Sequence, residues 1–399
     1  MLDDEAELRR FGYAQQLKRG MSAFGNFALS FSVISILTGG VSLYYYGLRL
    51  GGPIEMSVGW PIVSVMTLMV ALSLAELASA YPTAGALYHW ATILGGPRLG
   101  WWTAWLNLIG QIAVVAGVDY AFAEFVHDAS GMPAGRAWTL AIYAGVLGTH
   151  GLLNHIGIRV VTALNELSAW YHLVGTALLV VALWAWAPLQ PISFLTKRFV
   201  GTADDGMVYP FAYACFVGLL QAQWTFTGYD ASAHVAEETR GAQQAAPRGI
   251  VNAVWVSAVV GFVMLVVVTL AIGNLDEAAA AQNPFIYVIR HALGGRLGGA
   301  LVWMVIGAMW FCGLSAVTSN SRMLFAFARD GGAPLSPWLA RVSERHRTPA
   351  AAIWACVATA FLLAVWSRAY HVIVSISTIG FYVSYGLPIL LAIRARRHG

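Results

Sequence analysis

Charged residues are scarce in this chain. Of its 399 residues only 11% are charged, with 23 Lys and Arg against 19 Asp and Glu, whereas 58% are hydrophobic. A soluble domain carries about 25% charged residues, so this composition excludes a soluble enzyme and a disordered chain. The apolar residues form long unbroken runs rather than short alternating segments, which excludes an outer-membrane barrel. The class that remains is an all-α polytopic membrane protein.

Motifs for catalysis, metal binding and nucleotide hydrolysis are also missing. The three cysteines, Cys215, Cys312 and Cys356, lie inside apolar runs and form neither a disulfide framework nor a zinc spacing. The sequence has no P-loop, so ATP does not drive it, and no HExxH motif. It has no basic stripe with interleaved aromatic residues, as nucleic-acid binding needs. We therefore predict no enzymatic activity, no cofactor, no metal and no nucleic-acid partner.

Ten apolar segments are long enough to cross a lipid bilayer, the fourth being the shortest. Because the loops between them are short, no soluble domain is expected. The segments lie near residues 24–48, 58–80, 99–126, 138–153, 161–188, 209–229, 250–273, 298–326, 350–367 and 371–393.

The positive charges predict the orientation of these segments. Sixteen of the 23 Lys and Arg residues lie on the side that holds both termini, and the other seven are Arg49, Arg136, Lys197, Arg198, Arg290, Arg296 and Arg368. Lys and Arg concentrate in cytoplasmic loops. We therefore expect both termini in the cytoplasm and the chain in a bacterial-type inner membrane.

Two glycine-containing stretches interrupt apolar segments at matching places. Thr38, Gly39 and Gly40 lie in the middle of the first segment, and residues 227–230 lie near the end of the sixth. Gly costs about 1 kcal/mol inside a helix. Similar half-apolar linkers, residues 81–97 and 274–295, follow the second and seventh segments. Paired interruptions in two halves favour a transporter, although glycines also serve ordinary helix packing in membranes.

The matched halves predict an inverted repeat of five plus five helices, with helices 1 and 6 interrupted. The repeats are residues 24–188 and 209–393, joined by an outer linker at 189–208. Residues 1–23 and 394–399 are the predicted cytoplasmic ends.

Four stretches carry a family resemblance: residues 27–53, 73–91, 225–250 and 319–336. Together they resemble the first, second, sixth and eighth helices of amino acid–polyamine–organocation (APC) superfamily permeases. The branch that they resemble most holds GABA permeases, bidirectional amino acid transporters and fungal choline permeases. Members usually have twelve helices, so we expect a complete five-plus-five core without the last two.

The resemblance implies a substrate site at the two interruptions. It implies that Thr38, Gly39 and Gly40 bind the substrate carboxylate and that backbone carbonyls of the second interruption face its ammonium group. Aromatic rings there add an apolar or cation–π wall. The complete expected binding set is Thr38, Gly39, Gly40, Gln111, Trp224, Phe226, Thr227, Gly228 and Tyr382.

Other polar residues in the apolar segments are candidates for coupling or gating. An ionisable residue at membrane depth is a functional candidate by default, which singles out Asp230, Asp119 and His172, and Tyr385 is a gating candidate beside them. Asp230 alternatively lies at the cytoplasmic boundary, and His172 alternatively forms a structural hydrogen bond. Asp119 is expected near the outer surface. The hydroxyls of Ser315, Thr318 and Ser319 form a candidate cation site, although we favour a coupling proton over sodium.

The function predicted from the sequence is secondary active transport of amino acids or related amines such as GABA, by alternating access with proton symport or exchange. A choline or polyamine permease of the same fold is an alternative. A channel or a non-transporting sensor is an alternative from another class. The partners are a small-molecule substrate and the lipid bilayer, and the sequence predicts no oligomeric state.

Overall fold

The computed structural model describes residues 4–133, 135–203, 206–366 and 370–398. In these residues the secondary structure is helical, apart from one isolated bridge between Met21 and Thr239. Seven helices are long and apolar enough to cross a membrane. They are Ala23–Ser42, Glu55–Ala80, Pro97–Ala129, Ile158–Trp186, Ala242–Leu270, Pro284–Arg329 and Val372–Arg397, and a shorter apolar helix, Ala350–Trp366, accompanies them. The chain is therefore an all-α polytopic protein.

The helices of the first half begin at local signals in the sequence. Ser22 caps α2, because its hydroxyl accepts a hydrogen bond of 2.8 Å from the Gly25 N–H. The left-handed φ of 88° at Gly96 and the proline that follows it start α7. The helices are α1 (Asp4–Arg10), α2 (Ala23–Ile34), α3 (Ile36–Ser42), α4 (Tyr44–Leu50), η1 (Glu55–Gly59), α5 (Trp60–Ala80), α6 (Ala86–Gly95), α7 (Pro97–Ala129), α8 (Arg136–Ile156), α9 (Ile158–Trp186) and η2 (Ile192–Thr196).

The helices of the second half include the longest one, α15, which is broken at Gly294 by a φ of 73° and a ψ of 175°. Asn283 caps it by accepting from the Ile286 N–H. The helices are α10 (Phe211–Gly218), α11 (Leu220–Thr225), α12 (Ala231–His234), η3 (Ala236–Glu238), α13 (Ala242–Leu270), α14 (Leu275–Ala280), α15 (Pro284–Arg329), α16 (Ser336–Leu339), α17 (Ala350–Trp366) and α18 (Tyr370–His398).

The predicted apolar segments correspond to these helices with local differences. The first segment is divided into α2, α3 and α4, and the sixth into α10, α11 and a turn. The fourth coincides with α8, which is 21 residues long but is not among the seven helices that are both long and apolar enough to cross a membrane. Arg368, the ends of the chain at 1–3 and 399, and residues 204–205 of the predicted outer linker lie outside the described residues.

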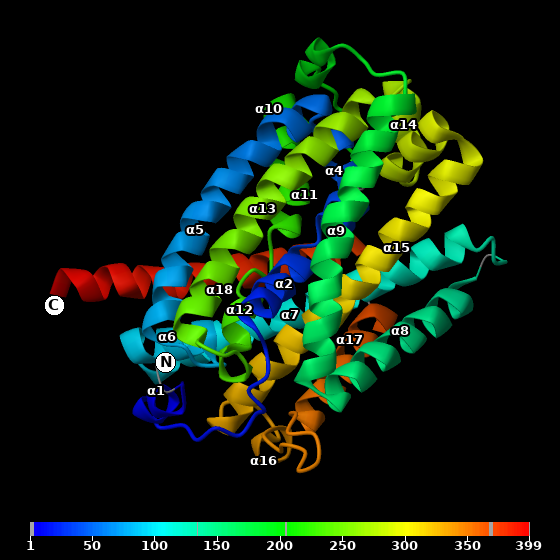
Figure 1. Cartoon of the computed structure of the whole chain (residues 1–399). Helices are drawn as coiled ribbons and strands as arrows, with labels where there is room; N and C mark the ends of the chain where they lie inside the picture. The colour runs from blue at the N-terminus through cyan, green and yellow to red at the C-terminus, as the bar shows by residue number, and fades with distance from the viewer. Residues whose placement is uncertain (1–3, 134, 204–205, 367–369, 399) are drawn as a thin grey trace.

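The long helices form a bundle with an apolar core and with many large apolar side chains that also face outward. In Figure 1, α13 runs between α5 and α9 and packs against both, while α18 crosses the bundle at a steep angle and packs along α7. Large apolar side chains such as Met66 (63% exposed) and Trp184 (67% exposed) point away from the bundle. Such an exposed apolar surface belongs in lipid.

The two ends of the bundle differ, and we name them by their helices. The N-terminal face carries α1 and α16, and the opposite face carries α4 and α14; they lie at the bottom and the top of Figure 1. The interior between them is rich in buried polar side chains, particularly where α2, α3, α11 and α12 meet. This polar interior is where the functional residues lie.

Candidate functional site

The first helix break lies at Ser35. Its φ of 36° and ψ of 83° are left-handed, which is uncommon for a residue with a side chain. The Ser35 carbonyl then accepts the N–H groups of Thr38 (2.8 Å) and Gly39 (2.9 Å), which starts α3. The prediction that Thr38, Gly39 and Gly40 form the interruption is therefore wrong by three residues, because these residues are helical within α3.

Hydrogen bonds from α9 hold Ser35 in this conformation. His172 Nδ1 lies 2.8 Å from the Ser168 carbonyl oxygen, which can only accept, so Nδ1 donates. In the neutral ring, Nε2 then accepts from the Ser35 hydroxyl at 2.7 Å, and Ser35 Oγ lies 2.6 Å from Thr38 Oγ1. His172 thus stabilises the break by its hydrogen bond with the Ser35 hydroxyl. This contact corresponds to the second of the two roles considered for His172, a structural hydrogen bond.

The second break is the turn at residues 226–230, between α11 and α12, where the sequence predicts an interruption. Gly228 has a φ of 82°, and its N–H donates to the Tyr385 hydroxyl at 3.0 Å. The Thr227 hydroxyl donates to the Trp224 carbonyl at 2.8 Å. A side chain at position 228 would be strained and would meet Val33 at 2.2 Å. Glycine is therefore required by both the backbone and the packing.

The two breaks contact each other through small residues. A Cβ at Gly39 would lie 2.7–2.9 Å from Thr225 atoms, so α3 and α11 cross at this glycine. Along α2, toward the N-terminal face, the Ser30 hydroxyl donates to the Tyr229 carbonyl at 2.8 Å, and the Asn26 amide donates to the Ser232 carbonyl at 2.9 Å. The polar backbone of each interrupted helix therefore lies against the other, as irregular backbone at membrane depth requires.

Aromatic side chains from several helices surround the second break. Trp224 is 4% exposed, and Gly117 of α7 leaves room for its ring. The ring of Phe226 is fully buried and lies 4.7 Å from that of Trp60. Tyr382 donates to the Gln223 carbonyl at 3.3 Å. These rings lie together around the second break, and the wall that they would present to a substrate stays a prediction.

A buried polar cluster surrounds Asp230, whose side chain is fully enclosed. Its Oδ1 accepts from the Tyr385 hydroxyl at 2.7 Å. Its Oδ2 accepts from the Asn107 amide at 3.1 Å and lies 3.0 Å from His234 Nε2. The Gln111 amide nitrogen lies 2.8 Å from Asn107 Oδ1 and 3.1 Å from the same His234 nitrogen. Predicted residues Asp230, Gln111 and Tyr385 are thus brought together.

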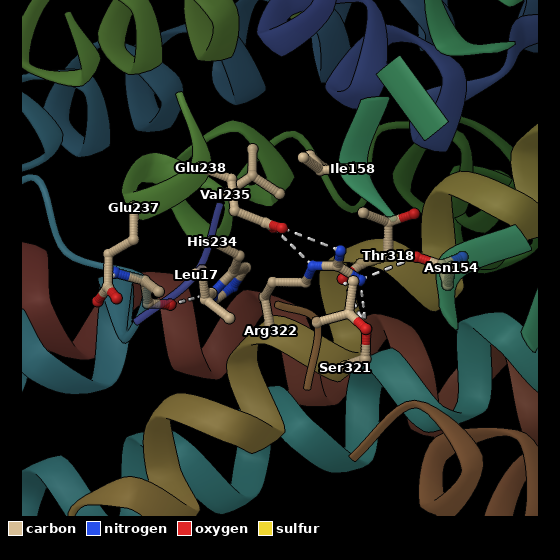
Figure 2. Close-up of polar contacts among 12 residues, drawn as sticks. Leu17, Asn154, Ile158, His234, Val235, Glu237, Glu238, Thr318, Ser321 and Arg322 are labelled. Carbon is tan, nitrogen blue, oxygen red and sulfur yellow. Dashed lines mark hydrogen bonds and ion pairs between the residues drawn. The ribbon is translucent and has the colours of Figure 1, made fainter. Parts of the chain in front are cut away.

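Two ion pairs bind η3 to α15 near the N-terminal face. Arg322 and Glu238 are fully buried and form a bidentate pair at 2.7 and 3.2 Å; Arg322 also donates to Asn154 and Ser321 (Figure 2). Arg329 pairs with Glu237 through two bonds of 2.9 Å. We call Glu237, Glu238, Arg322 and Arg329 the ion-pair cluster.

The N-terminal segment covers this cluster. The N–H groups of Gly20 and Met21 both donate to the Glu238 carbonyl at 2.9 Å, and the Arg240 N–H donates back to Met21 at 3.1 Å. The ring of Tyr13 lies 4.0 Å from the Arg329 guanidinium, and its hydroxyl donates to Asp330 at 2.7 Å. Burial, reinforced by Asp330, raises the pKa of Tyr13. Contacts among three chain segments, the N-terminal segment, residues 238–240 and the end of α15, thus cover the ion-pair cluster.

The opposite face of the bundle contains a cavity. A cavity of about 620 Å³ opens there between α4, the end of α7 and the start of α15. Its polar lining includes Glu124, Asp128, Arg290 and Tyr45, and it reaches Ser42 at the end of α3. The opposite face is thus hollowed as far as Ser42, while on the N-terminal face a cavity of about 600 Å³ lies between α1 and the start of α13.

The sequence pattern of the family described as "Amino acid permease" matches residues 22–398. The chain belongs to this family. The permease is 36% identical to the amino-acid permease BAT1 of Arabidopsis thaliana, over 99% of this chain and 82% of the relative. It is 35% identical to the BAT1 homolog of Oryza sativa subsp. japonica, over 98% and 81%. It is 28% identical to the GABA-specific permease of Saccharomyces cerevisiae, over 90% and 66%.

Family membership establishes the coarse function. Members are amino acid permeases, which transport a small-molecule substrate and are not enzymes. Together with its membrane-spanning helices this makes the chain a multi-pass membrane permease, and the predicted resemblance is confirmed.

Two predicted groups lie apart from the Asp230 cluster in this permease. Asp119, expected toward the outer end of its helix, is fully buried and lies 3.1 Å from His150 Nδ1 of α8, with Gly313 making room for its carboxylate. On α15, the Ser315 hydroxyl donates to Asn165 at 2.6 Å and the Thr318 hydroxyl to the Leu314 carbonyl at 2.9 Å, while Ser319 is buried beside them.

Sequence reasoning missed His234 and Ser384 among the residues around Asp230. Ser384 Oγ lies 3.3 Å from the Asn107 amide. His234 follows Asp230 by four residues, so helical spacing alone brings the two side chains to one face. The sequence therefore contains a signal for this contact, namely an acid and a histidine four residues apart within an apolar segment.

Proposed function

We propose that this permease is a secondary active transporter that moves amino acids or related amines such as GABA by alternating access, by proton symport or exchange. The observation that carries the proposal is the meeting of two interrupted helices in the interior, at Ser35 and at residues 226–230. Interrupted helices paired in this way hold substrate near the middle of the membrane in secondary transporters.

The surroundings of the two breaks suit a small zwitterion. We expect the substrate carboxylate beside Thr38, Gly39 and Gly40, and its ammonium group beside the backbone of Thr227 and Gly228. Trp224, Phe226, Tyr382 and Gln111 would complete the site. The first break is fixed by hydroxyl groups and the second by the Tyr385 hydroxyl. The contacts that fix the two breaks therefore involve hydroxyl groups and no unpaired charge, so they would not select for a substrate with a charged side chain.

The buried acids do not favour choline or a polyamine as substrate. Such cations need an unpaired carboxylate, but Asp230 is bonded to Tyr385 and Asn107 and lies beside His234, while Asp119 lies beside His150. Breaking these contacts to bind a substrate would leave buried polar groups unsatisfied, at about 1–3 kcal/mol each.

We further propose that the helices form a five-plus-five inverted repeat and that the N-terminal face is cytoplasmic. The ion-pair cluster would then be the inner gate, closed in this conformation, with the cavity at Ser42 as the outer vestibule. The excess of Lys and Arg on the side of the termini supports this orientation.

Counterflow in proteoliposomes tests the function. Vesicles are preloaded with one unlabelled amino acid, GABA, choline or putrescine, and uptake of the labelled compound is followed. We expect transient accumulation with an amino acid or GABA. Trp224→Ala should reduce it at least tenfold, whereas the matched control Trp184→Ala, whose ring faces away from the bundle, should not. Silence of folded protein toward every compound would favour a sensor, and a flux that does not saturate would favour a channel.

A further inference from the structure

We propose that Asp230 and His234 share one proton and that this pair is the site from which the coupling proton is released. The inference rests on the proposed transport function, but the geometry of the Asp230–His234 pair can be tested independently of transport. His234 Nδ1 lies 3.1 Å from the Ala84 carbonyl oxygen. A carbonyl oxygen only accepts hydrogen bonds, so Nδ1 must carry a hydrogen.

The other ring nitrogen then decides the charge of the pair. In a neutral histidine with hydrogen on Nδ1, Nε2 presents a bare lone pair. That lone pair lies 3.0 Å from Oδ2 of Asp230, and an ionised carboxylate also presents only lone pairs there. Two acceptors at this distance repel each other unless a proton lies between them. The pair therefore holds one proton more than an ionised Asp230 and a neutral His234 would carry.

The groups that face the pair favour the proton on the Asp230 side, because the Gln111 amide nitrogen is a donor and would oppose a hydrogen on His234 Nε2. From α7, the Asn107 amide donates to Asp230 Oδ2 and the Gln111 amide lies 3.1 Å from His234 Nε2. From α18, the Tyr385 hydroxyl donates to Oδ1 at 2.7 Å, and its ring lies 4.8 Å from that of Tyr229. Among the described residues no lysine or arginine forms an ion pair with Asp230. The proton is thus the cation that neutralises this carboxylate, which is costly to bury alone.

The backbone of one residue, Ala84, connects this pair to the ion-pair cluster. The Ala84 carbonyl accepts from His234, and the Ala84 N–H donates to Glu237 Oε1 at 3.2 Å. Glu237 is in turn held by Arg329. Ala84 lies between α5 and α6, whereas Glu237 and His234 belong to the segment after the second break. Any movement that separates these segments breaks both backbone hydrogen bonds of Ala84 at once.

This arrangement provides a route for release. When the N-terminal face opens, His234 loses the acceptor that fixes the hydrogen on Nδ1, and water reaches the pair. The shared proton then leaves to water on that side, with Asp230 ionised and His234 neutral. On return to the closed state, a proton taken from the opposite face restores the pair. One proton moves in each cycle, and no other group changes its charge.

Variants in proteoliposomes separate this proposal from the proposed function. In His234→Gln and Asp230→Asn, counterflow should persist but lose its pH dependence, and accumulation driven by an imposed pH gradient should fall to the level without a gradient. His155→Gln is the matched control, because His155 lies at the end of α8 with no carboxylate partner among the described residues, and it should keep both properties. Gradient-driven accumulation and a normal pH profile in His234→Gln would overturn the proposal while leaving the transport function intact.

A spectroscopic measurement tests the pair even if no substrate is transported. Of the ten histidines, the ¹⁵N-labelled signal lost in His234→Gln identifies His234. We expect its Nδ1 to be protonated and its Nε2 to show a shared proton, with the Nε2 shift changing in Asp230→Asn but not in His155→Gln. A His234 with hydrogen on Nε2 alone, or one that is unaffected by Asp230→Asn, would refute the shared proton.

Discussion

Replacing Gly39 by alanine probes the crossing of α3 and α11. A Cβ at this position lies 2.8 Å from the Thr225 Cα and 2.7 Å from its Oγ1. Non-bonded carbon atoms pack at about 3.5–4.0 Å, so the two helices must separate by about 0.7–1 Å. Overpacking of this kind costs about 1–3 kcal/mol. Because Thr225 contributes backbone here, rotation of a side chain cannot relieve the contact.

Gly40 provides the matched control one residue away. A Cβ there meets the flexible end of Met264 at 3.3 Å and Leu265 at 3.9 Å. Replacing a helical glycine by alanine otherwise stabilises a helix by about 0.5–1 kcal/mol. Gly40→Ala should therefore be neutral or slightly stabilising. Because both glycines lie in α3, the helix-propensity gain is common to the two variants, which should differ by the overpacking cost of about 1–3 kcal/mol.

Thermal unfolding in detergent and counterflow in proteoliposomes together measure this difference. We expect Gly39→Ala to unfold several degrees below Gly40→Ala and to bind substrate more weakly, because separating the breaks displaces both sides of the site. Equal unfolding midpoints and equal transport for the two variants would refute the crossing at Gly39.

Two further predictions concern the N-terminal face. Arg322→Met should destabilise the protein by about 3–5 kcal/mol, because Glu238 is left buried without its partner, and adding Glu238→Gln should recover much of the loss in thermal unfolding. Burial, with the nearby Arg329 charge, lowers the pKa of His89 to about 4. The unfolded chain therefore binds more protons between pH 6.5 and 4, and stability should fall by about 3 kcal/mol as the pH decreases through this range; unfolding midpoints should show a smaller decrease in His89→Gln.

Each of these predictions has its own contradicting result. If the Arg322 variant and the double variant unfold at the same temperature, the unpaired Glu238 carboxylate is not the cause of the destabilisation. If His89→Gln follows the same pH dependence as the wild-type protein, another group is responsible for acid destabilisation of this face.

The sequence predicted the long helices well because hydropathy alone determines them. The first interruption was misplaced for a physical reason. Glycine at 39 and 40 weakens a helix locally, but the break at Ser35 depends on His172, a residue 137 positions away in the chain. Gly39 instead allows the close approach of α11. A turn with a positive φ at Gly228, in contrast, is a local requirement, and the second interruption lies where the sequence predicted it.

The buried polar pairs show the same division. Asp230 and His234 are four residues apart, so their contact was accessible to inspection of the sequence. Asp119 and His150 come from separate helices, and their distance depends on how α7 packs against α8. The depth of Asp119 along its helix could be estimated from the sequence, but such an estimate does not tell which neighbour covers the residue.

The two backbone hydrogen bonds of Ala84, to Glu237 and to His234, imply that closure of the N-terminal face and protonation of the pair affect each other equally. If the closed N-terminal face fixes His234 and thereby favours the shared proton, then binding of that proton must favour the closed face by the same factor. A change at Arg329 would then shift the proton affinity of a histidine that it does not touch. Acidification on the opposite face would reset the transporter for the next substrate, without any separate sensor of pH.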